Sequence, residues 1–432
     1  MTNLLLETVQ RHKAGEPVGV TSVCSAHPLV LEAAVLQALD DSTALLVEAT
    51  SNQVNQSGGY TGMRPADFRD LVHEIADRNG LPHNRVVLGG DHLGPNAWRQ
   101  FCPDEAMDKA DALIDTFVAA GFTKIHLDCS MPCAGDPSPL TDDLIAERAA
   151  RLAKAAEDTA VREHGASELL YVVGTEVPAP GGAQKTIDAL TPTSPEAAQA
   201  TITRHQKAFD NAGVGLVWQR VIGLVVQPGV EFDHARVFEY ERGHTTKLRG
   251  AIDDHPHLVF EAHSTDYQTV ERLTELVEDH WAILKVGPGL TFALREALFA
   301  LAAIEDQLVD ANHRSDLVAV VERRMLAEPR WWQGYYEGDA RAQRLARRFS
   351  YSDRLRYYWP DREISAAQSS LLANLNAVDV PLPLLSQYLP DQYTRVRHGE
   401  LGLEPTALAI DRIRDVLRGY ARACRPTLRR SS

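Results

Sequence analysis

The chain of 432 residues is longer than a single hydrophobic core usually allows, unless the domain is a large α/β barrel with an extension. Hydrophobic residues make up 44% of the chain and charged residues 24%, a balance that is typical of a globular protein and excludes extensive disorder. The formal net charge of −15 disfavours nucleic acid and anionic membranes as partners.

The sequence contains no apolar run of the roughly 18 residues that a membrane-spanning helix needs. The first 16 residues are too polar for a signal peptide, so we expect a cytoplasmic protein. Five cysteines are few and odd in number, which argues against a disulfide framework. Cys129 and Cys133 are close in sequence, but no second pair follows them, so ordinary thiols are favoured over a structural zinc site.

One unit recurs along most of the chain: a short apolar run, a polar cluster and then a polar loop or a stretch of helical length. The eight apolar runs are Val18–Pro28, Ala44–Gln53, Arg85–His92, Lys124–Ser130, Leu169–Glu176, Arg220–Gly229, His257–Ser264 and Ala282–Gly289. Eight such units predict an α/β fold of the (β/α)8 TIM-barrel type. An open doubly wound sheet is the alternative, since period cannot show closure, but no G-x-G-x-x-G follows the first run.

The pattern changes after residue 310. The later segments Arg330–Gly338, Ser350–Pro360 and Val380–Tyr393 are rich in aromatic residues and show no strand repeat, and the chain ends in the amphipathic stretch Ala407–Cys424. We therefore predict a barrel over residues 1–310 and a mainly helical extension over residues 311–432, packed on or near the barrel mouth. Whether this extension, including Arg354 and Arg356, reaches over the mouth stays open.

Ionisable and polar groups gather at one end of the predicted strands. Catalytic residues of such barrels lie at the carboxyl ends of the strands. This sequence places there Ser25, His27, Glu48, Asp91, His92, Asp128, Glu176, Gln227, Glu261, His263 and Lys285. The opposite strand ends carry no comparable set, so the sequence predicts an active site at the mouth.

Three histidines are candidate metal ligands. His92 and His263 end two of the apolar runs, and His234 lies in the loop after the sixth. Three imidazoles around a barrel mouth are typical of a catalytic divalent metal, with Zn²⁺ the usual choice for nitrogen ligands. Gln227 is the alternative to His234 as the third ligand.

Three acids are candidate catalytic residues. Asp91 either orients the neighbouring His92 or carries a proton, and its alternative role is a helix cap. Glu176 supplies a second acid for acid–base work, or forms a salt bridge to Lys285. Asp128 is expected near the mouth.

His126 shares a strand face with Asp128 because of the two-residue strand period. If that face points inward, we expect His126 one layer deeper, as a core histidine with satisfied hydrogen bonds.

Several residues are candidates for substrate binding. The loop Ser51–Met63 is rich in amides, which match the hydroxyl groups of a polyol, although a polar loop without function explains it nearly as well. The full candidate set is Ser25, Asn52, Gln53, Gln227, Asp266 and Lys285. Gly287 and Gly289 precede a helical stretch that could bind phosphate, or are ordinary loop glycines.

The stretches SVCSAHPLV, VEATSNQVNQSGGYTGM, LGGDHLGPN, KIHLDCSMPCAGDP, GTEVPAPGG, VVQPGVEFDH, EAHSTDYQT, KVGPGLTFALREA, SDRLRYYWP and SQYLP cover residues 18 to about 390. With them the chain resembles the GatZ/KbaZ subunit family of class II D-tagatose-1,6-bisphosphate aldolase. The resemblance implies a class II aldolase barrel, a role in galactitol or N-acetylgalactosamine breakdown, and an accessory subunit that supports a catalytic partner. Some members of the family are metal-dependent ketose 4-epimerases.

The same resemblance implies roles for particular residues. In class II aldolases an Asp-His pair moves protons and binds zinc, which Asp91 and His92 match, and the later metal histidines correspond to His234 and His263. Where these aldolases have His-Gly-Gly-Ser-Gly to cradle a phosphate, this chain has His263-Ser-Thr-Asp-Tyr-Gln. Asp266 adds negative charge there and disfavours a phosphorylated ligand.

Two functions follow from these observations. The first is a subunit of a D-tagatose-1,6-bisphosphate aldolase in tagatose or galactitol catabolism. The second is a stand-alone metal-dependent ketose 4-epimerase, acting on fructose and tagatose or on tagaturonate and fructuronate by a retro-aldol route. The expected partners are a ketose or ketose phosphate, a catalytic aldolase subunit and further copies of this chain in a homo-oligomer.

Overall fold

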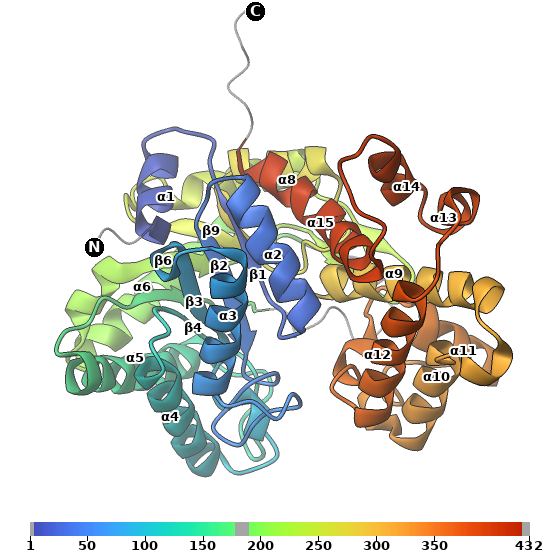
Figure 1. Cartoon of the computed structure of the whole chain (residues 1–432). Helices are drawn as coiled ribbons and strands as arrows, with labels where there is room; N and C mark the ends of the chain where they lie inside the picture. Colours follow the sequence, from blue (N-terminus) through green and yellow to red (C-terminus); the bar gives the residue numbers. More distant parts are fainter. Residues whose placement is uncertain (1–3, 178–189, 426–432) are drawn as a thin grey trace, which may run out of the picture.

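The computed structural model describes residues 4–177 and 190–425. Its central feature is a barrel of parallel strands: β1 (Val20–Val23), β2 (Leu45–Thr50), β3 (Val86–Leu93), β4 (Lys124–Leu127), β5 (Leu170–Val173), β6 (Val221–Val225), β9 (Val259–Ala262) and β10 (Trp281–Val286). The strands close in the order β1-β10-β9-β6-β5-β4-β3-β2 (Figure 1). Each coincides with one of the eight predicted runs, and the closure confirms a barrel instead of an open sheet.

The strands are buried on both faces, as parallel barrel strands are. In β4 the period of two decides which side chain points where. Ile125 and Leu127 belong to the apolar core around the barrel, whereas Lys124 and His126 contact carboxylates of other strands. The barrel is therefore apolar outside and carries buried charge inside.

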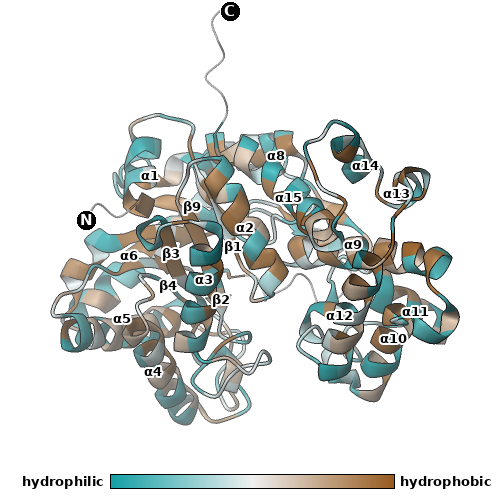
Figure 2. Ribbon diagram, in the orientation of Figure 1, coloured by the Kyte–Doolittle hydropathy of each residue, from teal (hydrophilic) through white to brown (hydrophobic). Residues whose placement is uncertain are grey.

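Helices surround the barrel: α1 (Leu4–Lys13), α2 (Pro28–Asp40), α3 (Pro65–Asn79), α4 (Pro103–Ala119), α5 (Asp142–His164), α6 (Pro195–Asn211), α7 (Thr246–Arg249), α8 (Val270–Glu278) and α9 (Pro288–Leu308). Ser and Thr residues cap several of them; the Ser194 hydroxyl, for example, accepts the Ala197 N–H at 3.1 Å. The outer helices carry hydrophilic faces (Figure 2). Within the described residues, no helix combines the length and apolar character needed to cross a bilayer.

A short hairpin, β7 (Glu231–Phe232) and β8 (Val237–Phe238), follows β6. The extension after α9 contains α10 (Leu317–Ala327), α11 (Ala340–Phe349), a 3₁₀ turn (Arg354–Tyr357), α12 (Arg362–Asn376), α13 (Leu382–Tyr388), α14 (Pro390–Arg397) and α15 (Pro405–Cys424). Helices α10 to α12 group at one side of the barrel, while α15 runs beside α2 and α8 (Figure 1). The Gly19 N–H donates to the Cys424 carbonyl at 2.9 Å, which ties the end of α15 to the start of β1. The boundary at residue 310 stays a prediction.

The end of β3 departs from regular strand geometry. The pairing of β3 with β4 shifts register between Gly90 and Leu93, and His92 adopts a φ of +48°. This left-handed conformation is uncommon for a residue with a side chain. Gly94 follows, and a Cβ added there would overlap the main-chain oxygen of Asp128. The close approach of β3 and β4 at this point therefore requires glycine.

Gly94→Ala is expected to lower the free energy of unfolding by about 1–3 kcal/mol, because the added methyl group forces β3 away from Asp128. Gly243→Ala is a matched control, since a Cβ at Gly243 meets no atom within 4 Å, and it should change stability by less than about 0.5 kcal/mol. Urea denaturation followed by circular dichroism measures both. Equal stability of the two variants would contradict this account of the β3–β4 contact.

Candidate active site at the barrel mouth

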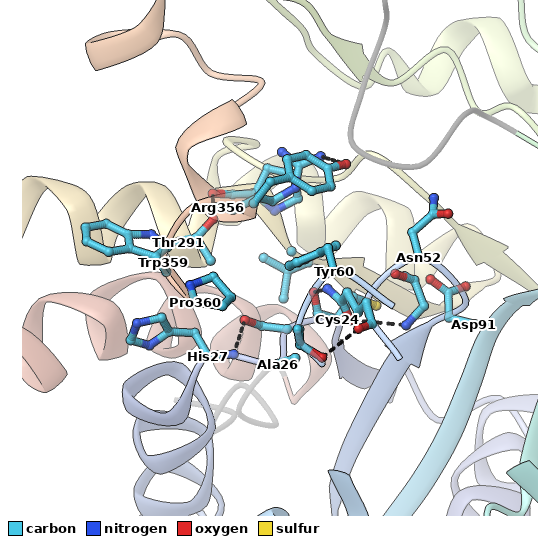
Figure 3. Close-up of a pocket in the computed structure, with 18 of the residues that line it drawn as sticks. Cys24, Ala26, His27, Asn52, Tyr60, Asp91, Thr291, Arg356, Trp359 and Pro360 are labelled. Atoms are coloured by element: carbon cyan, nitrogen blue, oxygen red, sulfur yellow. Dashed lines mark hydrogen bonds between the residues drawn. The ribbon is translucent and has the colours of Figure 1, made fainter. Parts of the chain in front are cut away.

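A cavity of about 440 Å³ opens at the carboxyl ends of the strands. Its inner end is lined by Asp91, His92, His263 and Lys285, its side by Ser25, Asn52 and Gln53, and its outer end by Arg356, Tyr357 and Trp359 of the extension. Asn52 and Asp91 lie on one side of the cavity, and Thr291, Trp359 and Pro360 on the other (Figure 3). The extension thus reaches over the mouth and completes its wall.

Four side chains meet at the inner end. Asp91, His92, His126 and His263 each offer one ligand atom, and these atoms lie within 4.8 Å of one another. The ring centroids of His92 and His126 are 5.0 Å apart, those of His92 and His263 are 5.0 Å apart, and those of His126 and His263 are 5.1 Å apart. All four residues are buried. A nearly equilateral group of imidazoles beside a carboxylate can hold a divalent metal.

Two further carboxylates hold the rings in place. Asp128 Oδ2 lies 2.7 Å from His92 Nδ1, and Glu261 Oε1 lies 2.9 Å from His263 Nε2. Each contact engages one ring nitrogen and leaves the other available, which is how carboxylates orient metal-binding histidines. Burial lowers the pKa of His263 to about 3, so its ring is neutral and suited to be a ligand at physiological pH.

A buried ion-pair network supports this group from below. Lys124 Nζ lies 2.7 Å from both Glu48 Oε1 and Glu261 Oε2, and all three side chains are fully buried. Lys285 contacts Asp91 and lies 3.5 Å from Glu261 Oε1. Burial works to lower the pKa of Lys285, but the carboxylates of Asp91 and Glu48 outweigh it and raise that pKa. Lys285 is therefore a permanent cation.

The charges of this network fit a divalent cation. It contains four carboxylates and two ammonium groups: Glu48, Asp91, Asp128 and Glu261 against Lys124 and Lys285. With neutral imidazoles, two negative charges stay uncompensated in the core, which is costly unless a cation joins them. Burial works to lower the pKa of His92, yet the neighbouring carboxylates of Asp91 and Asp128 outweigh it and raise that pKa. In addition, His126 Nε2 is buried without a hydrogen-bond partner.

Asp91 faces both the network and the cavity. Its Oδ1 atom contacts Lys285 and lies 2.9 Å from His126 Nδ1, and its Oδ2 atom lies 3.7 Å from His92 Nε2. Burial works to raise the pKa of Asp91, but His92 and Lys285 outweigh it and lower that pKa. The carboxylate is therefore ionised, and it can accept a proton or join the ligands. No side-chain hydrogen bond makes it a helix cap.

The structure does not bring His234 to this group. Its Nδ1 lies 3.1 Å from Ser352 Oγ, and its ring contacts Tyr336 edge-on at 5.2 Å. His126, which the sequence assigned to the core, lies in this group at the place predicted for His234. The reason is geometric: the loop after β6 forms the β7–β8 hairpin, and His234 at its turn is directed to the extension.

Two other candidates also lie outside the group. Glu176 is exposed, and its carboxylate accepts the Thr193 hydroxyl, so it forms neither the expected pair with Asp91 nor a salt bridge to Lys285. Most of the loop that follows Glu176 lies outside the described residues. Gln227 uses its Oε1 to accept the N–H groups of Gly229 and Val230, at 2.8 and 2.9 Å, and caps its own loop.

The remaining substrate-binding candidates do meet. Ser25, Asn52, Gln53, Asp266 and Lys285 all line the cavity. Gln53 is fixed by the Thr50 N–H at 3.1 Å and by the Cys24 carbonyl at 3.3 Å. Cys129 and Cys133 are free thiols and, among the described residues, belong to no metal-binding group.

Several residues of the site are not evident from the sequence. Lys124 was not singled out, although Lys124, His126 and Asp128 share the strand period and present three polar groups on one face. The sequence leaves open whether Arg356 reaches over the mouth, and it does not single out Tyr357. The sequence signal for these two residues is the segment Ser350–Pro360, in which aromatic residues and arginines occur together. This composition is expected of a segment that covers a polar surface.

One solved structure is closely similar to this chain: a probable tagatose 6 phosphate kinase from Sinorhizobium meliloti 1021, with 49% identity and a TM-score of 0.87 over 94% of this chain and 100% of that one. A putative fructose-1,6-biphosphate aldolase from Coccidioides immitis is 12% identical with a TM-score of 0.44, over 88% of this chain and 97% of that one. A fructose-bisphosphate aldolase from Campylobacter jejuni is 11% identical with a TM-score of 0.44, over 87% and 95%.

The family match covers nearly the whole chain. Residues 5–425 match the family described as D-tagatose-1,6-bisphosphate aldolase subunit GatZ/KbaZ-like. The match includes the barrel, the cavity and the extension that closes it. This protein therefore belongs to the GatZ/KbaZ-like family.

Proposed function

We propose that this chain itself performs metal-dependent aldol chemistry on a ketose, by reversible cleavage of the bond between C3 and C4. The observation that carries the proposal is the group of Asp91, His92, His126 and His263, set at the inner end of a cavity of sugar size. A chain that only supported a partner would have no need for buried imidazoles and uncompensated carboxylates facing its own cavity.

His92, His126 and His263 would hold the cation, with Asp91 as a fourth ligand or as a base beside it. A divalent cation, with Zn²⁺ the usual choice for nitrogen ligands, would polarise the ketose carbonyl as a Lewis acid and offset negative charge on the substrate oxygens. Asp128 and Glu261 keep two of the rings oriented through the hydrogen bonds described above.

In the forward direction Asp91 takes the proton of the C4 hydroxyl, and C4 with its oxygen becomes an aldehyde group. The electron pair of the C3–C4 bond passes to the fragment that contains C3, which leaves as an enediolate. Lys285, a buried cation beside Asp91, adds positive charge where the enediolate forms. Release of the two fragments gives an aldolase. Recombination on the opposite face of the aldehyde gives a 4-epimerase.

The cavity wall fits a polyol. Asn52 and Gln53 offer neutral amides, and Ser25 offers a hydroxyl. These groups bind hydroxyls without demanding a charge on the ligand, so a ketose or ketose derivative is the expected substrate class.

A second candidate is an accessory role. The family is that of a D-tagatose-1,6-bisphosphate aldolase subunit, which favours a chain that assists a separate catalytic aldolase. This role and the first differ in one respect: a supporting subunit converts no sugar until its partner is present.

Metal binding separates the two histidines that compete for the third position. We expect His126→Ala to weaken binding of one Zn²⁺ per chain by at least about tenfold, because it removes a ligand. His234→Ala is the matched control and should bind within about threefold of the wild type. Metal analysis of the purified proteins, with competition against a chromogenic chelator, measures both. The reverse order would restore His234 as the ligand and remove His126.

Turnover tests the reaction itself. The purified chain, loaded with Zn²⁺ and incubated alone with D-tagatose or D-fructose, should interconvert or cleave the sugar. Asp91→Asn should retain metal and lose about 10²-fold or more in kcat, because proton transfer is removed. Sugar analysis by chromatography gives the rates. If metal is bound but no sugar is converted until a catalytic subunit is added, the stand-alone function fails and the accessory role stands.

A further inference from the structure

The part of the cavity next to α9 contains a buried acid that the mechanism above does not use. Asp266 lines the cavity and is 3% exposed. Its Oδ1 atom accepts the main-chain N–H of Gly287 at 2.9 Å and that of Gly289 at 2.7 Å. Gly287 is the N-cap residue of α9, a helix of 21 residues, and Gly289 lies in its first turn.

Free N–H groups at the start of a long helix, at the edge of a cavity, form a natural binding place for a phosphate or carboxylate group. Here that place is already taken by a carboxylate of the chain itself. A Cβ at Gly289 would lie only 3.1 Å from Asp266 Oδ1, so the acid is held tightly against the turn.

A cation that acts on Asp266, the guanidinium of Arg356, also has partners within the chain. Arg356 donates to the carbonyls of Ser352 and Asp353 and, at 3.0 Å, to the Tyr357 hydroxyl. Burial works to lower the pKa of Arg356, but neighbouring groups, including the Asp353 carboxylate, raise it. Asp353 in turn accepts the Thr291 hydroxyl at 2.5 Å. Thr291 and Arg356 both line the cavity.

We propose that Asp266, by occupying the N–H groups of Gly287 and Gly289, makes this end of the cavity specific for an uncharged, hydroxyl-bearing end of the sugar and excludes a phosphate or carboxylate there. This inference rests on the proposed function. It goes further by fixing the substrate class: at least one end of the ketose is not phosphorylated.

The chemistry of the wall agrees with this assignment. A sugar hydroxyl both donates and accepts hydrogen bonds, so it can donate to the carboxylate of Asp266. A phosphate has only acceptor oxygens when fully ionised. It would face a buried like charge at Asp266, and the N–H donors that could compensate are engaged.

Two variants separate the occupation of the Gly287 and Gly289 N–H groups from the effect of the negative charge of Asp266. Asp266→Ala opens the two N–H groups, whereas Asp266→Asn removes the charge but keeps an oxygen that can accept from both. We expect Asp266→Ala to bind inorganic phosphate at least tenfold more tightly than Asp266→Asn and the wild type, in calorimetric titrations of the zinc-loaded proteins. Phosphate bound at the metal contributes equally to all three and cancels. Equal affinity of the Ala and Asn variants would overturn the proposal.

The wild type provides a test that needs no variant. D-tagatose 1,6-bisphosphate carries a phosphate at both ends, so it must be rejected whichever way the sugar lies. We expect kcat/KM for free D-tagatose to exceed that for the bisphosphate by at least 100-fold. Equal or faster conversion of the bisphosphate would overturn the proposal. This test uses only the wild type, so it holds even if Asp266→Ala does not fold. If no sugar is converted at all, the proposed function fails, and phosphate titration still decides the role of Asp266.

Discussion

The ion pairs of Lys124 with Glu48 and Glu261 inside the barrel are the contact on which the site depends. Ion pairs in a core add little net stability, because desolvation offsets their attraction, but loss of one partner leaves a buried charge and costs about 3–5 kcal/mol. Their value here is positional. Lys124 fixes Glu261, which in turn fixes the His263 ring, while Lys285 links the same acids to Asp91. The ion pairs of Lys124 deeper in the barrel thereby determine the positions of His263 and Asp91 at its mouth.

Chemistry and recognition come from different parts of the chain. The imidazoles and acids that can carry the reaction stand on strands β3, β4 and β9 or one residue after them, and β10 contributes Lys285. The outer wall comes from the extension, through Arg356, Tyr357 and Trp359. Tyr357 is itself stacked on Trp331 at 4.9 Å and packed against Tyr60 at 4.7 Å. An aromatic layer thus joins the extension to the loop after β2.

The sequence predicted the strands well, because a repeating period and a gathering of polar groups at one end of each run are properties of the pattern itself. His92 and His263 followed from their places at strand ends. His126 could not be predicted as part of the site, because an inward position on β4 does not reveal which residues of β3 lie at the same level along the barrel axis. The register shift and the left-handed His92 set that level, and they arise from packing between β3 and β4. The position of His234 in a loop after β6 does not reveal the direction in which its side chain points.

The hydrogen bond between Gly19 and Cys424 ties the end of α15 to the amino end of β1, opposite the cavity, and residues of α1 and α15 line one groove there. Fusion partners, affinity handles or an immobilising support attached through either of these elements would therefore stand away from the opening through which a sugar enters. The same adjacency makes the molecule a reasonable scaffold for relinking the chain in a different order, with new ends cut elsewhere on the barrel's outer surface.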